Sequence, residues 1–238
     1  MLNSQALIIS VHMPKTAGVS FRATLEEHFG SDFQQDYADY PLAYSPAQRH
    51  RMAEEANSRL LAADLASVNC IHGHFLPAKY LALAEARECH FVTWLREPVS
   101  RLVSHYYYWL RAYDSDSPLV SSLHRRVVEE SWTLEAFCLS EELKNVYSAF
   151  LWGLPAENLD FIGITEHYEE DLQVFAQRFF GENVTPRKMN RRDDAPEKGS
   201  GRLEMSADLR AQIECFHAED VALYQRAVAA RQGSYTLR

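Results

Sequence analysis

One short stretch near the start of the chain combines a cation, two hydroxyl groups and a turn. It reads HMPKTAGVSF over residues 12–21 and carries Lys15, Thr16 and Ser20 around Gly18. The proline and the glycine in it are typical of a turn. A helix that begins at such a turn presents unpaired backbone N–H groups and the positive end of its dipole. Together with a lysine and two hydroxyls, these groups predict a phosphate-binding loop.

Hydrophobic periodicity predicts the elements that position this loop. Residues 6–11 read ALIISV, a short apolar run rich in β-branched residues, which is typical of a strand buried on both faces of a parallel sheet. Phe21, Leu25 and Phe29 recur at four-residue steps and predict a helix with one apolar face behind the loop. The loop is not a Walker A loop, G-x-x-x-x-G-K-[ST], because its lysine precedes its glycine.

Two histidines lie at the end of the next predicted strand, residues 67–75, which read SVNCIHGHF. On an extended chain His72 and His74 point the same way, and Gly73 between them permits close approach of a ligand. Two such imidazoles can bind a metal, transfer protons or serve as hydrogen-bonded structural groups. No acidic residue or third histidine lies close by in the sequence, which disfavours metal binding.

A third candidate region reads CHFVTWLREPVSRLVSHYYYWLR from residue 89 to residue 111. Its first seven residues predict another buried strand, and Arg96 follows at the carboxyl end, where open α/β sheets bind ligands. Pro98 suits the first turn of a helix that carries Ser104. An arginine fork and a hydroxyl can hold one phosphate together. Alternatively, Arg96 pairs with a carboxylate and Ser104 has no role in binding.

These three regions resemble the motifs of sulfotransferases that use 3′-phosphoadenosine-5′-phosphosulfate (PAPS). HMPKTAGVSF is similar to the 5′-phosphosulfate loop, H-x-P-K-T-[AG]-[GS]-x-S-F, of the branch containing heparan sulfate 2-O-sulfotransferase and many carbohydrate sulfotransferases. REPVSRLVSHYYY is similar to the 3′-phosphate motif, R-[DE]-P-x-x-R-x-x-S-x-Y-Y, and His-Gly-His to the catalytic segment of that branch. The resemblance extends from about residue 7 to residue 230.

The resemblance implies an α/β fold of three layers, like that of P-loop kinases, with a central parallel β-sheet flanked by helices. It also implies in-line transfer of a sulfuryl group from PAPS to an acceptor hydroxyl, which releases adenosine 3′,5′-bisphosphate and requires no metal. His72 would be the base, His74 a supporting residue, and Lys15 the cation that neutralises the leaving oxygen. The implied nucleotide-binding residues come from the loop, the phosphate grip and a later basic segment: Lys15, Thr16, Ala17, Gly18, Val19, Ser20, Phe21, Arg96, Ser104, Arg191 and Arg192.

Length and composition fit a single α/β domain over residues 1–238. A net charge of −9 argues against a general nucleic-acid binder, which needs a basic surface. Four widely separated cysteines predict free thiols, with neither a disulfide framework nor a zinc site. The first strand begins too early for a signal peptide and no apolar run reaches membrane-spanning length, so we expect a cytoplasmic, bacterial protein. The expected acceptor is a glycan or another small alcohol.

The rest of the chain gives weaker expectations. We expect a loop over residues 31–45, whose tyrosines either contact an acceptor or pack, and one terminal helix over residues 207–232. Trp132, Asn145 and Tyr147 are candidate acceptor contacts, with core packing as the alternative. Two other functions stay open: a nucleotide-dependent kinase on the same fold, and a nucleotide-binding module without catalysis.

Overall fold

The computed structural model describes residues 6–37, 39, 44–60, 65–118, 120–186, 205–233 and 235–237. The described residues form a sheet of five parallel strands in the order β2-β3-β1-β4-β5. The strands are β1 (Leu7–Val11), β2 (Phe33–Asp36), β3 (Cys70–Gly73), β4 (Cys89–Leu95) and β5 (Phe161–Ile164). All residues of β1, β3 and β5 are buried, as their short apolar sequences predict.

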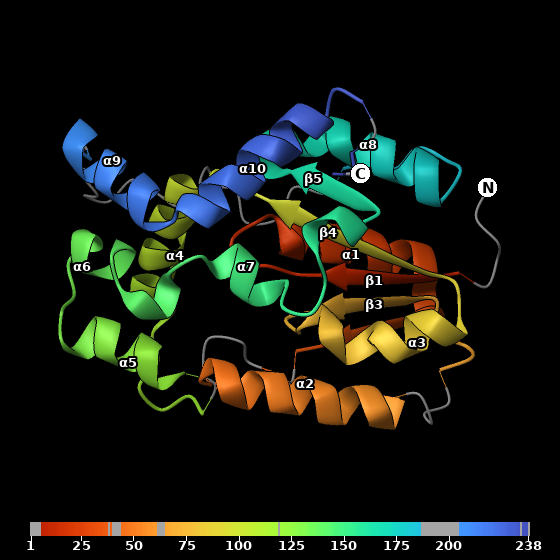
Figure 1. The fold of residues 1–238 in the computed structure, drawn as a ribbon, viewed down its shortest axis with the longest axis horizontal. Coiled ribbons are helices and arrows are strands. Elements are labelled where there is room, and N and C mark those ends of the chain that lie inside the picture. Colours follow the sequence, from red (N-terminus) through yellow and green to blue (C-terminus); the bar gives the residue numbers. More distant parts are fainter. Residues whose placement is uncertain are drawn as a thin grey trace.

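The helices cover both faces of this sheet and extend beyond its carboxyl edge (Figure 1). The α-helices are α1 (Gly18–Phe29), α2 (Pro46–Leu60), α3 (Leu81–Ala86), α4 (Pro98–Ala112), α5 (Ser122–Glu129), α6 (Leu134–Cys138), α7 (Val146–Phe150), α8 (Tyr168–Phe179), α9 (Ala207–Phe216) and α10 (Ala218–Ala230). Short 3-10 helices are η1 (Gly30–Asp32), η2 (Pro77–Tyr80), η3 (Glu141–Leu143), η4 (Ala156–Asn158) and η5 (Thr165–His167).

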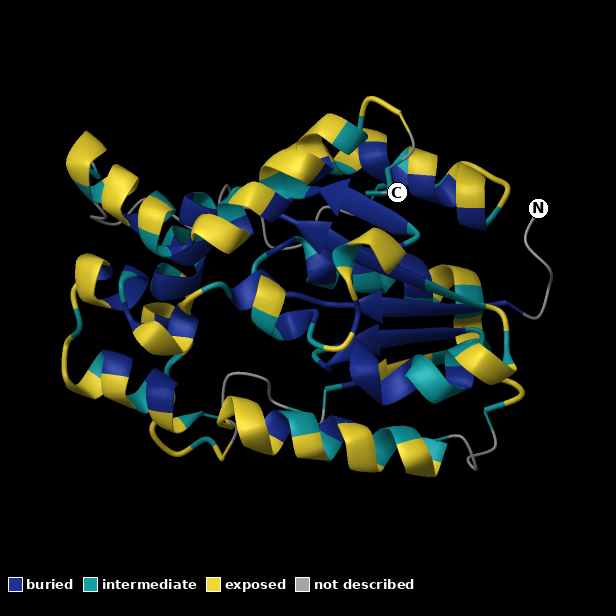
Figure 2. Cartoon of the chain, viewed as in Figure 1, coloured by how far each residue is buried: buried dark blue, intermediate teal, exposed yellow. Residues whose placement is uncertain are grey.

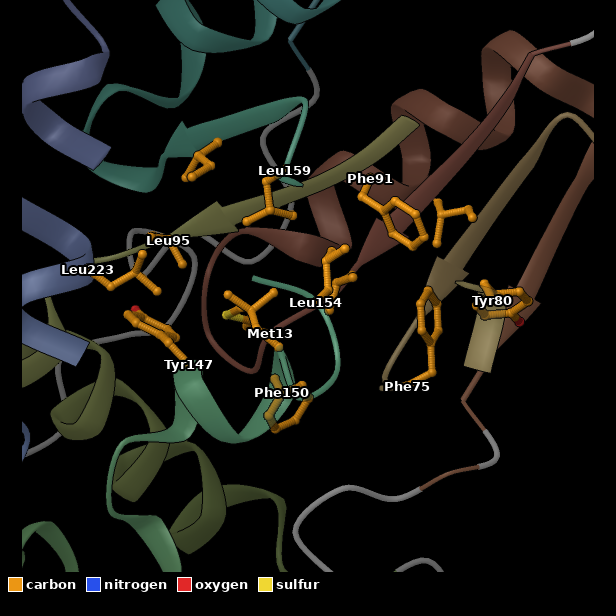
Figure 3. Packing of buried hydrophobic residues seen from close by; sticks show 14 of the residues in the cluster. Met13, Phe75, Tyr80, Phe91, Leu95, Tyr147, Phe150, Leu154, Leu159 and Leu223 are labelled. Atoms are coloured by element: carbon orange, nitrogen blue, oxygen red, sulfur yellow. The ribbon is translucent and has the colours of Figure 1, made fainter. Parts of the chain in front are cut away.

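Two apolar clusters fix the layers. On one face, Phe21 of α1 and Phe175 of α8 pack against Ile8 and Val92 of the sheet. The opposite face packs against α3, α7 and α10, whose buried residues include Leu83, Phe150 and Leu223. Figure 2 shows the strands buried between helices whose outer sides are exposed, and Figure 3 shows the second cluster from close by. The predicted α/β fold with a central parallel sheet between helical layers is therefore confirmed.

A third cluster lies past the strand ends, where α4, α5, α6 and α9 pack together through Leu102, Leu123, Phe137 and Ile213 (Figure 1). Because β1 lies between β3 and β4, the segments that follow these three strands meet at the same edge. All three predicted site motifs follow one of these strands.

Two expectations from the sequence are wrong. The predicted loop over 31–45 contains η1 and β2, an edge strand paired in parallel with β3. The predicted single helix over 207–232 is two helices that meet at His217. The His217 ring is buried, where Nε2 donates to the Cys138 carbonyl at 2.7 Å and Nδ1 accepts the Asn145 N–H at 3.2 Å. The buried, hydrogen-bonded His217 ring therefore lies where the chain departs from one straight helix.

Candidate functional site

The loop between β1 and α1, residues 12–17, is held in shape from its buried side. Met13 is fully buried in the core, and the Thr16 hydroxyl donates to the Met13 carbonyl at 2.9 Å. Lys15 and Ala17 both have left-handed backbone conformations, with φ of 68° and 63°. Non-glycine residues rarely adopt this conformation, and it often accompanies a functional constraint. The loop thus turns sharply at two points before α1 begins.

Gly18, the first residue of α1, lies directly against His12. A Cβ atom at Gly18 would be 1.9 Å from two atoms of the His12 ring, so no other residue fits without movement of the ring or the helix. Among the described residues no side chain caps this end of α1, and the Phe21 N–H donates to the Ala17 carbonyl at 3.1 Å. The positive end of the helix dipole therefore lies behind the loop without a protein anion as a cap.

The loop and α4 approach each other through Lys15. Its Nζ atom lies 4.1 Å from the centre of the Tyr108 ring, a cation–π contact with an exposed tyrosine of α4. Ser104 precedes Tyr108 by four residues and so lies on the same side of that helix, one turn earlier. The side of α4 that carries Ser104 therefore faces the β1–α1 loop.

Arg96 joins the first and third predicted motifs directly. It follows β4, and its guanidinium Nη1 donates to the Lys15 carbonyl at 3.5 Å, across 81 positions of sequence. Two cations and a serine side chain, Lys15, Arg96 and Ser104, are thereby gathered beside the start of α1. This is the arrangement expected of a site for a ligand with more than one phosphate or sulfate group.

Three histidines form a second part of the site, the imidazole cluster of His12, His72 and His74. The His12 ring stacks on both others, with ring centres 4.9 Å from His72 and 4.3 Å from His74. His72 lies beneath α1 with 1% of its surface exposed, and its Nδ1 is 2.8 Å from the Ser10 hydroxyl. His74 is more exposed, and its Nδ1 donates to the His12 carbonyl at 2.5 Å.

Burial keeps all three rings neutral. It lowers the pKa of His72 to about 3, with a further lowering by the nearby His74. Burial likewise lowers the pKa of His12 well below its usual value, helped by both neighbouring imidazoles. The pKa of His74 is also lowered by burial, against the opposing effect of its hydrogen bond to the His12 carbonyl. At neutral pH all three rings are therefore neutral, so each has one N–H group and one unprotonated nitrogen.

Some predicted residues act only through the backbone or lie elsewhere. The Phe21 side chain is fully buried against Trp94 and Phe175, with ring centres 5.3 and 4.9 Å apart, so only its backbone faces the site. Val19 and Ser20 belong to the first turn of α1. The predicted contacts of Arg191 and Arg192 lie outside the described residues.

The structure adds residues that the sequence did not single out. His12 belongs to the loop motif, but its stacking on His72 and His74 is a contact across 60 or more positions that no local pattern shows. The Tyr37 hydroxyl is 2.9 Å from His12 Nδ1, so one of the tyrosines in the predicted loop contacts the imidazole cluster.

Tyr147, a candidate acceptor contact, is fully buried and is hydrogen-bonded to the backbone of Arg96.

The described residues contain no group of three or more histidine, cysteine or acidic side chains that could hold a metal ion. None of the helices they form is both long and apolar enough to cross a membrane.

The chain is similar to known proteins in structure but not in sequence. No family model matches the chain, and no curated protein sequence matches it. Among solved structures, the chain is similar to a sulfotransferase from Alicyclobacillus acidocaldarius, with 17% sequence identity over 94% of this chain and 95% of that one, and a TM-score of 0.47. A similarity this distant says nothing about chemistry, so the function must be argued from the residues of the site.

Proposed function

We propose that this chain is a sulfotransferase that moves a sulfuryl group from PAPS to a hydroxyl of an acceptor. The observation that carries this proposal is the contact between Arg96 and the Lys15 carbonyl. It unites two segments that each resemble a nucleotide motif of the PAPS-dependent sulfotransferases. Sulfuryl transfer, like phosphoryl transfer, depends mainly on positioning and on cations placed where negative charge develops. Lys15 and Arg96 supply such cations.

Each part of the site has a role in this proposal. The backbone N–H groups of residues 16–20 hold the 5′-phosphate at the start of α1. Arg96 and Ser104 hold the 3′-phosphate, the guanidinium as a fork and the hydroxyl as one further donor. Lys15 neutralises charge on the oxygen that leaves with the nucleotide. Its present contact with the Tyr108 ring places the ammonium group on the side of the loop that faces α4.

The imidazole cluster takes the proton of the acceptor hydroxyl. His72 is the base that the resemblance implies, with His74 in support. Both are held as neutral rings through burial, and a neutral imidazole can accept a proton directly. The Ser10 hydroxyl and the His12 carbonyl hold the two Nδ1 atoms. Because Nδ1 of His74 donates, Nε2 of His74 is its unprotonated nitrogen, whereas Nε2 of His72 is buried and an acceptor hydroxyl reaches it only if the segment above it moves.

The finer identity of the acceptor is part of the proposal. The motifs are those of a branch that sulfates carbohydrates, so glycans and small alcohols are the acceptors to screen first. The net charge of −9 makes a strongly anionic polymer a poorer fit than a neutral sugar or alcohol, since like charges repel. We further propose that the protein acts in the cytoplasm of a bacterium.

Calorimetric titration with adenosine 3′,5′-bisphosphate and with 5′-AMP tests the nucleotide site. We expect the bisphosphate to bind at least about tenfold more tightly, because charge-assisted hydrogen bonds to a second phosphate are among the stronger ones. Arg96→Met should remove this preference, whereas Arg111→Met, at an exposed position of α4, should keep it. Equal binding of the two nucleotides by the wild type would reject the proposal and favour a nucleotide without a 3′-phosphate, as a kinase would use.

Transfer rates of histidine variants test the base. With a hydroxyl acceptor found by screening, His72→Asn should lower the rate by about 100-fold or more, the usual contribution of a general base. Its binding of the bisphosphate should be unchanged, which shows that the variant is folded. If instead His74→Asn lost the activity and His72→Asn kept it, the base would be His74, the more exposed ring.

A further inference from the structure

The turn that carries Arg96 is held at its backbone by a single buried hydroxyl group. The Tyr147 hydroxyl accepts the Arg96 N–H at 3.0 Å and donates to the Arg96 carbonyl at 2.5 Å. One oxygen thus satisfies both backbone groups of the residue that follows β4. These contacts connect α7 to the β4–α4 turn, Arg96 and Glu97, across 51 positions of sequence.

Tyr147 is itself rigidly placed. It is fully buried beside Leu95 and Leu223, as Figure 3 shows. Its own N–H donates to both carboxylate oxygens of Asp220, at 3.0 and 3.1 Å. The guanidinium of Arg101, also fully buried, lies 5.5 Å from the centre of its ring. A side chain held by these contacts cannot move together with the β4–α4 turn, so it can fix the position of the Arg96 backbone.

The ionisation of Tyr147 supports the same geometry. Burial raises the pKa of the phenol, and the carboxylates of Asp220 and Glu166 raise it further, while Arg101 and the Arg96 backbone lower it. The hydroxyl therefore keeps its proton at neutral pH and remains a donor to the Arg96 carbonyl. Phenylalanine at this position would keep the ring but leave a buried N–H and a buried carbonyl without their partner.

We infer that Tyr147 is a positioning residue, which sets the Arg96 guanidinium for the 3′-phosphate by holding the Arg96 backbone. This inference rests on the proposed function. The Tyr147 hydroxyl is already engaged with the N–H and carbonyl groups of Arg96, which argues against the direct acceptor contact that was one of the two roles the sequence allowed. The effect on binding is expected to be large for a residue that touches no ligand, because the charge-assisted hydrogen bonds of an arginine fork depend on its geometry.

Glu97, the residue after Arg96 in the turn, is held by a different side chain, so loss of the Tyr147 hydroxyl should affect Arg96 specifically. The Glu97 N–H donates to Glu166 Oε1 at 3.0 Å, so the residue after Arg96 has its own support from η5. Loss of the Tyr147 hydroxyl would therefore loosen Arg96 alone and leave the start of α4 in place. The predicted defect is confined to the 3′-phosphate.

The test compares Tyr147→Phe with Tyr106→Phe by calorimetric titration. Tyr106 is a matched control because its hydroxyl also donates to a backbone carbonyl, that of Trp132 at 2.8 Å, and contacts no part of the β4–α4 turn. We expect Tyr147→Phe to weaken binding of adenosine 3′,5′-bisphosphate about tenfold or more while binding of 5′-AMP changes less than about twofold. Tyr106→Phe should leave both affinities as in the wild type.

A double-variant comparison separates positioning from a general structural effect. In an Arg96→Met background, Tyr147→Phe should cause no further change in the ratio of the two affinities, because the residue acts through Arg96. A ratio that stays at the wild-type value in Tyr147→Phe would overturn the inference while leaving the proposed function intact. A wild type without preference for the bisphosphate would overturn both.

One measurement needs no variant and covers the case in which Tyr147→Phe fails to fold. Hydrogen exchange of the wild-type Arg96 amide, which donates to the tyrosine hydroxyl, should be as slow as that of amides inside β4. Exchange as fast as in an exposed loop would show that the hydroxyl does not hold the turn, and the inference would fail.

Discussion

The two strand–helix junctions of the candidate site, β1–α1 and β4–α4, differ in whether a side chain caps the N-terminus of the helix. At the β1–α1 junction, the helix begins after a residue in the left-handed conformation, and no side chain among the described residues caps it. At the β4–α4 junction, Pro98 occupies the first turn, and the Glu97 carboxylate accepts the N–H groups of Val99 at 3.1 Å and Ser100 at 2.8 Å. The second helix start already holds an anion of its own, and the first does not.

This difference shows where a phosphate can bind through the backbone. A carboxylate at a helix N-terminus satisfies the same N–H groups and the same dipole that a phosphate would use. The N–H groups at the start of α4 are therefore already occupied, and in the proposed function this junction binds phosphate only through the side chains of Arg96 and Ser104. The start of α1 is the one that can bind a phosphate through its N–H groups. The two junctions would thus recognise a two-phosphate ligand by different physical means.

The groups at the two junctions also differ in their response to acid. Acidification has the largest predicted effect on the free energy of unfolding. His72 has a pKa of about 3 in the folded protein against an ordinary value of 6.5. Between these values the unfolded chain binds a proton that the folded one does not, so the stability from this group is lost as the pH falls from 6.5 towards 3. The loss amounts to about 1.4 kcal/mol per pH unit, or about 5 kcal/mol in all.

Glu97 responds over a lower pH range. Burial raises its pKa, but the hydrogen bonds from Ser100 and Val99 and the charge of Arg210 outweigh that effect, and the pKa lies below the usual 4.5. A lowered carboxyl pKa gives stability that is lost only as the pH falls through that lower value. On acidification, the stability that comes from neutral His72, which packs against His12 of the β1–α1 loop, should therefore be lost before the stability that comes from Glu97.

Urea unfolding at pH 6.5, 5.5 and 4.5 tests this order. His72→Asn should lose about 1.4 kcal/mol less per pH unit than the wild type, because one titrating group has been removed. Ser58→Ala, at an exposed position of α2, is the control and should show the wild-type slope, because it removes no titrating group. Equal slopes for His72→Asn and the wild type would mean that the imidazole cluster is not buried as described.

The next prediction concerns the fit of the β1–α1 junction. Gly18→Ala should lower the free energy of unfolding by about 1–3 kcal/mol, the usual cost of overpacking, since its Cβ would lie 1.9 Å from the His12 ring. Gly233→Ala is the matched control, because its Cβ would meet only the Ala230 carbonyl at 3.9 Å, and it should change stability by less than about 0.5 kcal/mol. Similar effects of the two changes would show that His12 does not pack against α1.

Much of this arrangement could be predicted because it is local in sequence. β1 and β4 are mostly apolar, and the loop, the His-Gly-His segment and the Arg-Glu-Pro turn are short motifs at the carboxyl ends of strands. β2 could not be predicted in this way. Its four residues read FQQD, the two glutamines are exposed, and its pairing with β3 depends on a chain segment more than 30 residues later.

The contacts that complete the site are long-range, and no local pattern indicates them. The His12 ring meets His72 and His74 only because β1 and β3 are neighbours in the sheet. Tyr147 meets Arg96 because α7 packs against the sheet face beneath β4. Sequence motifs therefore pointed to the candidate groups, whereas the side chains that contact those groups could be found only from the fold.

The smallest predicted effect tests whether Glu97 acts as a cap or as an ion-pair partner. Its carboxylate also pairs with Arg210 of α9 at 3.0 Å, and Arg210 pairs with Glu214 at 2.9 Å. Glu97→Ala should lower the free energy of unfolding by about 1 kcal/mol, as loss of an N-cap does. Glu214→Ala removes an exposed partner of the same arginine and caps nothing, so it should cost less than about 0.5 kcal/mol.

Thermal unfolding in the presence of the bisphosphate sharpens the same comparison. If the start of α4 is closed by its own carboxylate, Glu97→Ala should lower the unfolding temperature equally with and without ligand, because the backbone contacts of the ligand lie at α1. A variant in which the ligand restored the lost stability would show that a phosphate can replace the Glu97 carboxylate. The two junctions would then differ in their capping side chains but not in their ability to bind a phosphate.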